Sequence, residues 1–461
     1  MADQPILSLG PDILRPVEPA NFPKAILRYR SDRAAGEVGL AQLSNEDWAR
    51  HFARFDPLPD SLTEPLALAY HGHQFRVYNP DIGDGRGFLF AQLRDGAGRL
   101  MDLGTKGSGR TPFSRDGDGR LTLKGAVREV LATEMLEALG VPTSRTLSVI
   151  ETGEDLHRYD EPSPTRSAVM VRLSHSHIRF GTFQRLAALK DEEGMARLLA
   201  YVRDEFYPAL AEGDAAGLLR AVSERMAVHA ARLMAAGFTH GVLNTDNMNI
   251  TGECFDYGPW KFTPTVDPGW TAASFDRTGL YAFGRQPEAI YWNLAALADA
   301  LRPIGDPEEL KDVLEVYPDA YAKAFPDAIL RRLGVRPSDP QADQSFASDL
   351  FVFLNKTRLP LERAFFDLFA GSAGRGKRLR SPHSDTYAGE EIIRRLDAYE
   401  PLQPERAEHP IFRREPPTLL PDDVEALWDP ITEADDWSAF EAKVAAIREY
   451  GEALAIADRF S

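Results

Sequence analysis

Cysteine is nearly absent from this chain, because Cys254 is the only one among 461 residues. A single thiol excludes an intrachain disulfide and a cysteine-rich zinc site. No run of about 18 apolar residues occurs, so the sequence predicts no membrane-spanning helix. The first residues lack a charged segment followed by a long apolar stretch, so no secretory signal is expected. Together these absences favour a reducing, bacterial-type cytoplasm as the compartment.

Positive charge is in deficit, since 53 Lys and Arg residues stand against 70 Asp and Glu residues and give a formal net charge of −17. A general nucleic-acid-binding surface is therefore not expected, because phosphate backbones are held by surplus Lys and Arg. A local basic cleft is still compatible with this balance. The hydrophobic content of 43% and the length are typical of a globular protein with two or three packed subdomains.

Two common nucleotide-binding motifs are also missing. The P-loop pattern G-x-x-x-x-G-K-[ST] is absent, because Lys106 precedes its glycines and no helix is expected to begin on them. No G-x-G-x-x-G follows a strand with an acidic residue at the proper distance, which disfavours a Rossmann domain. Residues 106–120 instead form a loop rich in glycine and arginine, whose Lys106 could reach a phosphate. Residues 83–86 (Gly-Asp-Gly-Arg) either admit a phosphate close to the backbone or form a bare hairpin turn.

A helix is expected over residues 124–139, where apolar residues follow one stripe and Gly140 marks the end. Glu129 could pair with Lys106 and hold it at phosphates, as a helix Glu does for a strand Lys in protein kinases. The alternative is an ordinary exposed helix glutamate. Strands are expected over residues 146–152 and 167–173. Arg172 and Arg179 then either face a triphosphate or pair with the acidic surface, and the sequence does not decide between these interpretations.

The stretch from residue 238 to 259 contains residue types that hold a divalent metal against a phosphate. A short apolar run leads into the polar loop 244–247, and a glycine-containing turn leads on to Asp256. Asn247 and Asp256 offer hard oxygen ligands, which suit Mg²⁺ that shares its shell with phosphates and waters. The alternative is a polar loop with Asx turns, which Asn and Asp favour through side-chain to backbone bonds.

The second half of the chain is predicted to be helical. A mainly β first half followed by helices predicts an α+β, protein-kinase-like fold with two lobes and terminal extensions. The expected division is an N-terminal extension (1–68), a β-rich nucleotide-binding lobe (69–181), a helical lobe with the metal loop (182–371) and a divergent C-terminal extension (372–461). Residues 372–425 are expected to be irregular, and a last helix over residues 437–460 is expected to pack on the helical lobe. The helices expected before them span residues 183–188, 195–207, 215–236, 287–301, 307–314, 319–333 and 345–354.

Several short blocks between residues 70 and 303 resemble the selenoprotein O family of pseudokinase-like protein adenylyltransferases, and their shared order is more specific than any one block. They are residues 71–75, 83–86, 106–115, 118–120, 128–129, 178–181, 240–248 and 256–259. The resemblance implies a kinase-like fold that binds ATP in a flipped orientation and transfers AMP to hydroxyl side chains of other proteins. The implied partners are ATP and these protein substrates, with Mg²⁺ or Mn²⁺ as the metal and with neither nucleic acid nor membrane.

The resemblance also implies a role for each matching residue. Asp246 would be the general base, and Asn247 and Asp256 would bind Mg²⁺. Family members commonly carry a cysteine or selenocysteine near the C-terminus, whereas no cysteine follows Cys254 here, so redox control through such a residue is not expected. The residues that would hold or line the nucleotide are Lys106, Arg172 and Arg179 at the phosphates, Glu129 as the partner of Lys106, and Gly83, Gly85, Arg86, Asp118, Gly119 and Asp256.

Ordinary kinase chemistry lacks its usual base in this sequence. Kinase catalytic loops place the base Asp five residues before the metal-binding Asn, and that position before Asn247 is Val242. Asp246 could serve from a different face, because neighbouring residues on an extended loop point apart. Attack at the α-phosphorus would release pyrophosphate, whose charge the Lys and Arg residues could neutralise. A kinase-like phosphotransferase and an inactive nucleotide-binding pseudokinase scaffold remain as alternatives.

Overall fold

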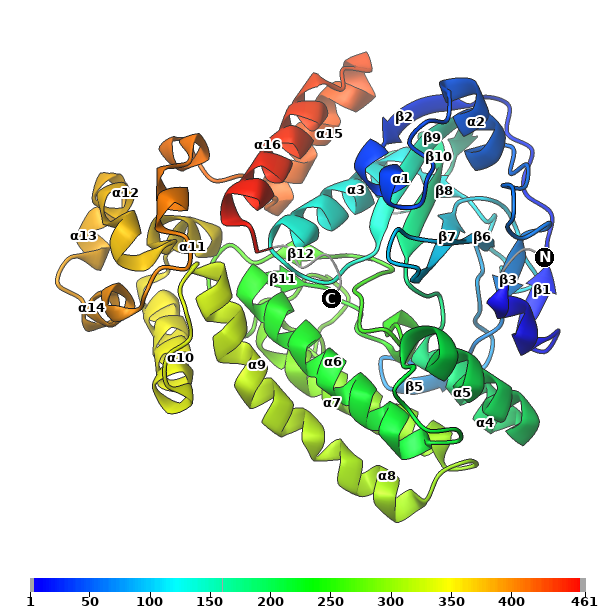
Figure 1. The fold of residues 1–461 in the computed structure, drawn as a ribbon. Coiled ribbons are helices and arrows are strands. Elements are labelled where there is room, and N and C mark those ends of the chain that lie inside the picture. The colour runs from blue at the N-terminus through cyan, green and yellow to red at the C-terminus, as the bar shows by residue number, and fades with distance from the viewer. Residues whose placement is uncertain (1–3, 160, 457–461) are drawn as a thin grey trace.

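An antiparallel sheet of eight strands forms the first part of the molecule in this computed structural model, which describes residues 4–159 and 161–456 (Figure 1). Seven strands follow one another in the order β1-β3-β6-β7-β10-β9-β2, and β8 pairs with β10 beside this path. The mixed α and β composition expected from the sequence is confirmed. The strands are β1 (Leu14–Pro16), β2 (Ile26–Arg30), β3 (Leu66–Leu68), β6 (Leu89–Arg94), β7 (Leu100–Lys106), β8 (Leu121–Thr122), β9 (Arg145–Leu156) and β10 (Thr165–Ser174).

The pairing of β7 with β10 aligns the residues on which the site depends. Arg172 lies opposite Gly104, and Lys106 lies opposite Met170. Because side chains alternate along a strand, residues 102, 104 and 106 share one face of the sheet with Arg172. All seven residues of β7 are buried, so this polar face is shielded from solvent.

Helix α3 (Leu123–Ala138) covers the sheet beside β9 and β10, close to the bounds expected from its apolar stripe. It begins after Thr122, whose side chain accepts a hydrogen bond from the backbone N–H of Gly125 at 3.1 Å. This capping bond satisfies one of the amides that a helix start leaves unpaired. The helix buries most of its residues, Glu129 and Glu134 among them.

The second part of the molecule is helical, and α6 (Ala215–Ala236) packs against α7, α8 and α9 (Figure 1). This helix has the bounds expected from the sequence, and it ends at Gly237, whose φ of 67° is the left-handed conformation that glycine adopts readily. The other helices of this part are α4 (Phe180–Leu189), α5 (Glu192–Phe206), α7 (Gln286–Leu301), α8 (Pro307–Leu314), α9 (Val316–Arg332), α10 (Pro340–Thr357) and α11 (Leu361–Leu368).

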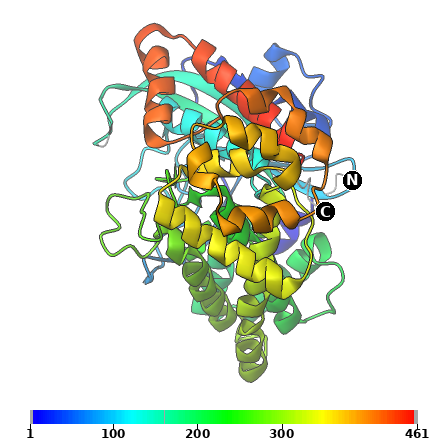
Figure 2. The same ribbon diagram turned by 90° about the vertical axis from the view of Figure 1, so that its left-hand side faces the viewer.

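The region from residue 372 to 425 is not irregular, and this expectation is wrong. It contains α12 (Arg375–Arg380), α13 (Ser384–Tyr387) and α14 (Glu391–Ala398), which lie in one group with α10 in Figure 1 and Figure 2, and the start of α15 (Pro421–Ala434). The first three have between four and eight residues. Helices this short have too few turns to give a clear apolar period, so composition rich in Arg and Pro hides them.

The last helix, α16 (Ser438–Leu454), lies along α3, so its expected packing on the helical part needs correction. Phe460, the expected end of this helix, lies outside the described residues. Arg448 on α16 forms a bidentate ion pair with the buried Glu134 of α3, with N–O distances of 2.7 and 2.9 Å. Only the last turns reach α11, where the Tyr450 hydroxyl donates to Glu362 at 2.6 Å.

Replacing Arg448 with Met is expected to lower the free energy of unfolding by about 2 kcal/mol, because Glu134 would lose a charged hydrogen-bond partner in a buried setting. The matched control is Arg414→Met, since Arg414 pairs with Glu449 of the same helix but is 54% exposed. Exposed pairs contribute about 0–1 kcal/mol. Urea denaturation of both variants measures the difference, and equal losses would contradict the special role of the α3–α16 contact.

Residues of the expected N-terminal extension take part in the main sheet, since β1 pairs with β3 and β2 pairs with β9. Residues 1–68 therefore supply strands to the same sheet that carries Lys106. Among the residues that the structure describes, no helix combines the length and the apolar character needed to cross a membrane.

Candidate functional site

Lys106 at the end of β7 and Glu129 on α3 form a buried ion pair, with 2.5 Å between Nζ and Oε2. Glu129 is 2% exposed, so the interpretation as an ordinary surface glutamate is wrong. Burial lowers the pKa of Lys106 from its ordinary value, although the Glu129 carboxylate opposes this shift. An ammonium that is partly desolvated and has one carboxylate partner attracts further negative charge.

Arg172 and Arg179 point into the molecule and share the carboxylate of Asp256. Nη1 of Arg172 lies 2.5 Å from Oδ1 of Asp256, and Nη1 of Arg179 contacts Oδ2. Both guanidinium groups also lie over the Phe255 ring. The alternative in which these arginines pair with the acidic surface is therefore wrong, because both are less than 5% exposed.

Asp256 has an unusual backbone and a strongly stabilised charge. Its φ of 56° lies in the left-handed region, which Asp adopts more readily than most residues. Burial raises its pKa, but the guanidinium groups of Arg172 and Arg179 and the ammonium of Lys106 outweigh burial and hold the pKa well below its ordinary value. Asp256 is thus a carboxylate, available to cations, at the meeting point of β7, β10 and the helical part.

The polar loop expected around Asn247 is present, and it contains a 3-10 turn at Thr245–Asn247 after the short strand β11 (Phe238–Thr239). In the run 248–250, Asn249 forms an isolated antiparallel bridge with Arg179. The side-chain amide of Asn247 donates to the carbonyl oxygen of Val242 at 2.8 Å. This bond occupies the amide nitrogen and leaves the Asn247 oxygen for another partner.

Asp246 lies beside Asn247 in a buried position with one unpaired oxygen. Its Oδ2 accepts a hydrogen bond from Gln74 at 3.2 Å, whereas its buried Oδ1 has no hydrogen-bond partner. Burial raises the pKa of Asp246 to about 6, although Arg179 acts in the opposite direction. A buried acceptor without a partner is uncommon, and one beside a cluster of charged groups indicates a binding or catalytic role.

Residues 83–87 pack against the loop that follows Lys106. The side chains of Thr111 and Ser114 donate to the carbonyl oxygens of Asp84 and Gly85 at 2.6 and 2.5 Å. A Cβ on Gly83 would lie 2.5 Å from the Phe113 ring. The glycines Gly83 and Gly85 are thus required by the close packing of two loops, a reason beyond the hairpin turn and phosphate approach considered from the sequence.

Arg86 is exposed beside this packing, and its charge contributes to lowering the pKa of Lys106. Asp118 and Gly119 lie farther along the same loop. Asp118 pairs with Arg158 at 2.8 Å, and Gly119 has a φ of 70° with the backbone of Gly109 against it. Their contacts are therefore with the loop and the β9–β10 turn rather than with Lys106 or Asp256.

The structure adds contacts that the sequence did not indicate, although the residues that make them lie in the blocks 71–75, 83–86 and 240–248 of the resemblance. Asp84 accepts from the backbone N–H of Leu68 at 3.0 Å and lies 3.3 Å from Nη2 of Arg179. The hairpin of β4 (Gly72–Gln74) and β5 (Val77–Asn79) is anchored to the polar loop, since the backbone N–H of His73 donates to Thr245 at 2.7 Å. These partners are far apart in the chain, so no local sequence signal could have identified them.

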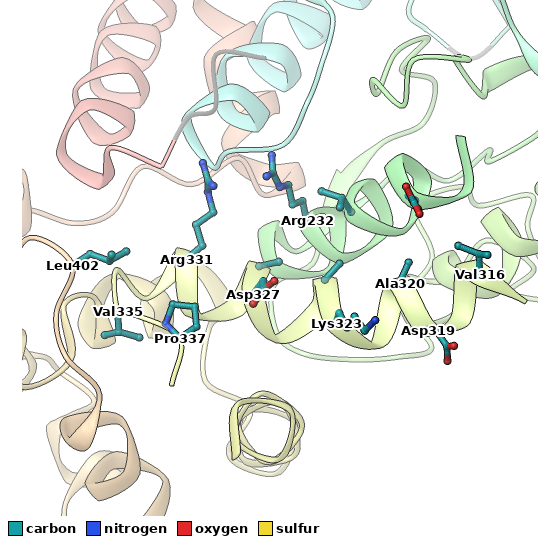
Figure 3. Close-up of a pocket in the computed structure, with 14 residues that line it drawn as sticks. Arg232, Val316, Asp319, Ala320, Lys323, Asp327, Arg331, Val335, Pro337 and Leu402 are labelled. Atoms are coloured by element: carbon teal, nitrogen blue, oxygen red, sulfur yellow. The ribbon is translucent and has the colours of Figure 1, made fainter. Parts of the chain in front are cut away.

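The cavity of about 790 Å³ in Figure 3 lies elsewhere, between α6 and α9. Arg232, Lys323 and Asp327 line it, and none of the candidate residues does. The charged cluster around Asp256 is a better candidate site than this cavity, because it combines buried charges, a carboxyl group with a raised pKa and an unpaired acceptor.

The chain is similar to known proteins over most or nearly all of its length. The family model described as "Protein adenylyltransferase SelO" matches residues 3–448. A protein nucleotidyltransferase YdiU from Synechocystis sp. is 50% identical over 71% of this chain and 69% of its own length. Proteins of the same name from Synechococcus elongatus and Gloeobacter violaceus are 41% and 42% identical, over 97% and 96% of this chain and 95% and 94% of their own lengths. The resemblance noted in the sequence is thereby confirmed, and the chain belongs to the SelO family of protein adenylyltransferases.

Proposed function

We propose that this chain transfers AMP from ATP to hydroxyl groups of Ser, Thr or Tyr side chains in other proteins, with release of pyrophosphate. The observation that carries the proposal is the contrast between Val242 and Asp246, which both precede Asn247 in the polar loop. Val242 stands where a kinase has its base, but its aliphatic side chain cannot take a proton, and its carbonyl oxygen accepts from the Asn247 amide and the Asn244 backbone N–H. Asp246, in contrast, has a buried oxygen without a partner and a raised pKa.

Lys106, Arg172 and Arg179 are proposed to hold the phosphates of ATP. Their charges are now balanced by Glu129 and Asp256, so an entering polyphosphate would exchange carboxylate contacts for phosphate contacts. Fixed cations in a water-poor site stabilise charge that develops on a leaving group, because they need no reorganisation during the reaction. The nucleotide site is proposed to include Gly83, Gly85, Arg86, Asp118 and Gly119 at its rim.

Asn247 and Asp256 are proposed to bind Mg²⁺, with Mn²⁺ as an alternative. The donor set fits a hard cation, because both side chains offer oxygen and the Asn247 amide nitrogen is already engaged with Val242. Among the described residues there is no group of three or more His, Cys, Asp or Glu suited to a metal, so two protein ligands would leave the remaining positions to phosphates and waters. When bound, the metal would neutralise phosphate charge.

Asp246 is proposed to be the general base. Its free Oδ1 would take the proton of the acceptor hydroxyl, whose oxygen would then bond to the α-phosphorus. The bond from that phosphorus to the bridging oxygen would break, and pyrophosphate would leave with the electron pair. A carboxylate whose pKa is near 6 suits this role, because a base works best when its pKa is close to the operating pH.

The arrangement of these residues supports a protein-kinase-like fold of two lobes as the finer description. We assign the nucleotide-binding lobe to residues 69–181 and the helical lobe with the metal loop to residues 182–371. The N-terminal extension (1–68) would complete the sheet, and the C-terminal extension (372–461) would hold α3 through α16. The Lys106–Glu129 pair between strand and helix is the feature that supports this assignment.

Parallel incubations with α-³²P-ATP and γ-³²P-ATP test the reaction, with the chain and a mixture of soluble proteins as acceptors. Transfer of AMP is expected to label protein from the α position only and to yield pyrophosphate. Label from the γ position only, with ADP as product, would show a kinase-like phosphotransferase instead. ATP binding without any label would leave an inactive nucleotide-binding scaffold.

A further inference from the structure

A glycine on β7 makes room for the ring of His177. Gly104 lies opposite Arg172 in the sheet, and a Cβ on Gly104 would be 1.9 Å from Nε2 of His177. The ring therefore lies directly on the backbone of Gly104, where a side chain would otherwise project. Asp102 and Arg172 share this face, so His177 fills a notch between a carboxylate and a guanidinium group.

Both ring nitrogens of His177 face a polar partner. Nε of Arg172 donates to Nε2 of His177 at 3.3 Å. Oδ2 of Asp102 lies 3.3 Å from Nδ1 and also accepts from the backbone N–H of His177 at 2.9 Å. Because Nε2 must be unprotonated to accept from Arg172, the ring proton belongs on Nδ1, toward the carboxylate.

Asp102 is held in turn by Gln92, which lies opposite it on the neighbouring strand. The side-chain amide of Gln92, on β6, donates to Oδ1 of Asp102 at 2.8 Å and to the hydroxyl of Tyr201, on α5, at 3.1 Å. Asp102 is 1% exposed, and both of its oxygens have partners. A buried, fully bonded network of this kind fixes the orientation of each member.

We infer that His177 is a positioning residue for Arg172, and this inference rests on the proposed role of Arg172 at the ATP phosphates. By accepting from Nε, the ring turns the terminal nitrogens of the guanidinium toward Asp256, where Nη1 makes its contact. The order Asp102, His177, Arg172 resembles the way in which an outer carboxylate fixes a histidine that holds a functional group. The block 178–181 of the resemblance begins one residue after His177, so the resemblance did not indicate this histidine.

A purely structural role would make a different prediction. If His177 only fills the notch, a ring of similar size without nitrogen should replace it. If His177 acts by accepting a hydrogen bond at Nε2, a side chain with an amide oxygen near that position should replace it better than a ring without nitrogen. His177→Phe and His177→Gln therefore separate packing from hydrogen bonding.

The experiment measures calorimetrically the binding of a non-hydrolysable ATP analogue with Mg²⁺. His177→Phe is expected to weaken binding about 10-fold, because a hydrogen bond to a charged group is lost. His177→Gln is expected to stay within about 3-fold of the unmodified chain, because its amide oxygen can still accept. The matched control is His175→Gln, because the ring of His175 faces Glu253 at 2.9 Å, and it is expected to leave binding unchanged.

A double-mutant cycle with Arg172→Ala measures whether the effect of His177→Phe on binding depends on Arg172. A role in packing alone predicts no such dependence. In that background, His177→Phe is expected to weaken binding by less than about 2-fold, because the group that it positions is gone. Additive effects, or Phe replacing His177 better than Gln, would overturn the inference. If His177→Phe does not fold, Gly104→Ala takes its place in the cycle, since its methyl group would displace the ring. Because binding is measured without turnover, failure of AMP transfer leaves this test intact.

Discussion

Replacing Asp246 with Asn is expected to reduce the rate of AMP transfer by about 10²–10⁴-fold, the range that a positioned general base contributes. The change removes the charge but keeps the size of the side chain, and its oxygen can still accept from Gln74. The affinity for an ATP analogue is expected to stay within about 3-fold, because the proposed phosphate contacts are made by other residues. Single-turnover transfer from α-³²P-ATP and calorimetric binding measure the two quantities separately.

Asp343→Asn is the matched control for this substitution. Asp343 on α10 is also buried, but its carboxylate accepts from the backbone N–H and the hydroxyl of Ser338, each at 2.9 Å, and from the hydroxyl of Tyr399 at 2.8 Å, which are not residues of the candidate site. It is expected to lower stability while leaving the transfer rate per folded molecule unchanged. Transfer by Asp246→Asn at nearly the original rate would remove Asp246 from the mechanism and require another base.

Long helices with a regular apolar spacing and a clear end signal were predictable from the sequence. The helix at residues 215–236 was expected with its observed bounds, because its apolar residues recur at helical spacing and Gly237 supplies the left-handed end. The helix that carries Glu129 was placed within one residue at each end. The short helices between residues 372 and 425 were missed, since their stability comes from tertiary contacts such as Arg378 with Asp397 at 2.7 Å.

The part of the candidate site in which one charged residue implies a partner of opposite charge was predictable from the sequence. A strand lysine suggests a helix carboxylate, and Lys106 does pair with Glu129. Other contacts of the site residues were not predictable, because they depend on strand register and on loops that are far apart in the chain. Asp84 reaches Arg179 only through loop packing, and His177 reaches Arg172 only because Gly104 leaves space in the sheet.

The buried pair of Lys106 and Glu129 has consequences for both stability and chemistry, and substitution can separate them. Lys106→Met is expected to lower the free energy of unfolding by about 3–5 kcal/mol, because it leaves a buried carboxylate without its main partner. Glu129 Oε1 has no hydrogen bond, and Arg172 at 3.7 Å is the remaining cation near it. The same variant is expected to lose about 10²–10³-fold in AMP transfer, because a fixed charge at the phosphates is removed.

The double variant Lys106→Met with Glu129→Met is expected to regain most of the stability, because exchanging both partners of a buried pair for apolar groups is often neutral. It is not expected to regain activity. Lys377→Met is the matched control, since Lys377 is also buried and donates to the carbonyl oxygens of Phe366 and Phe369, outside the candidate site. Urea denaturation and α-³²P transfer are measured on all three. If Lys377→Met lost as much transfer as Lys106→Met, or if the double variant recovered transfer along with stability, the loss at Lys106 would reflect folding and not phosphate binding.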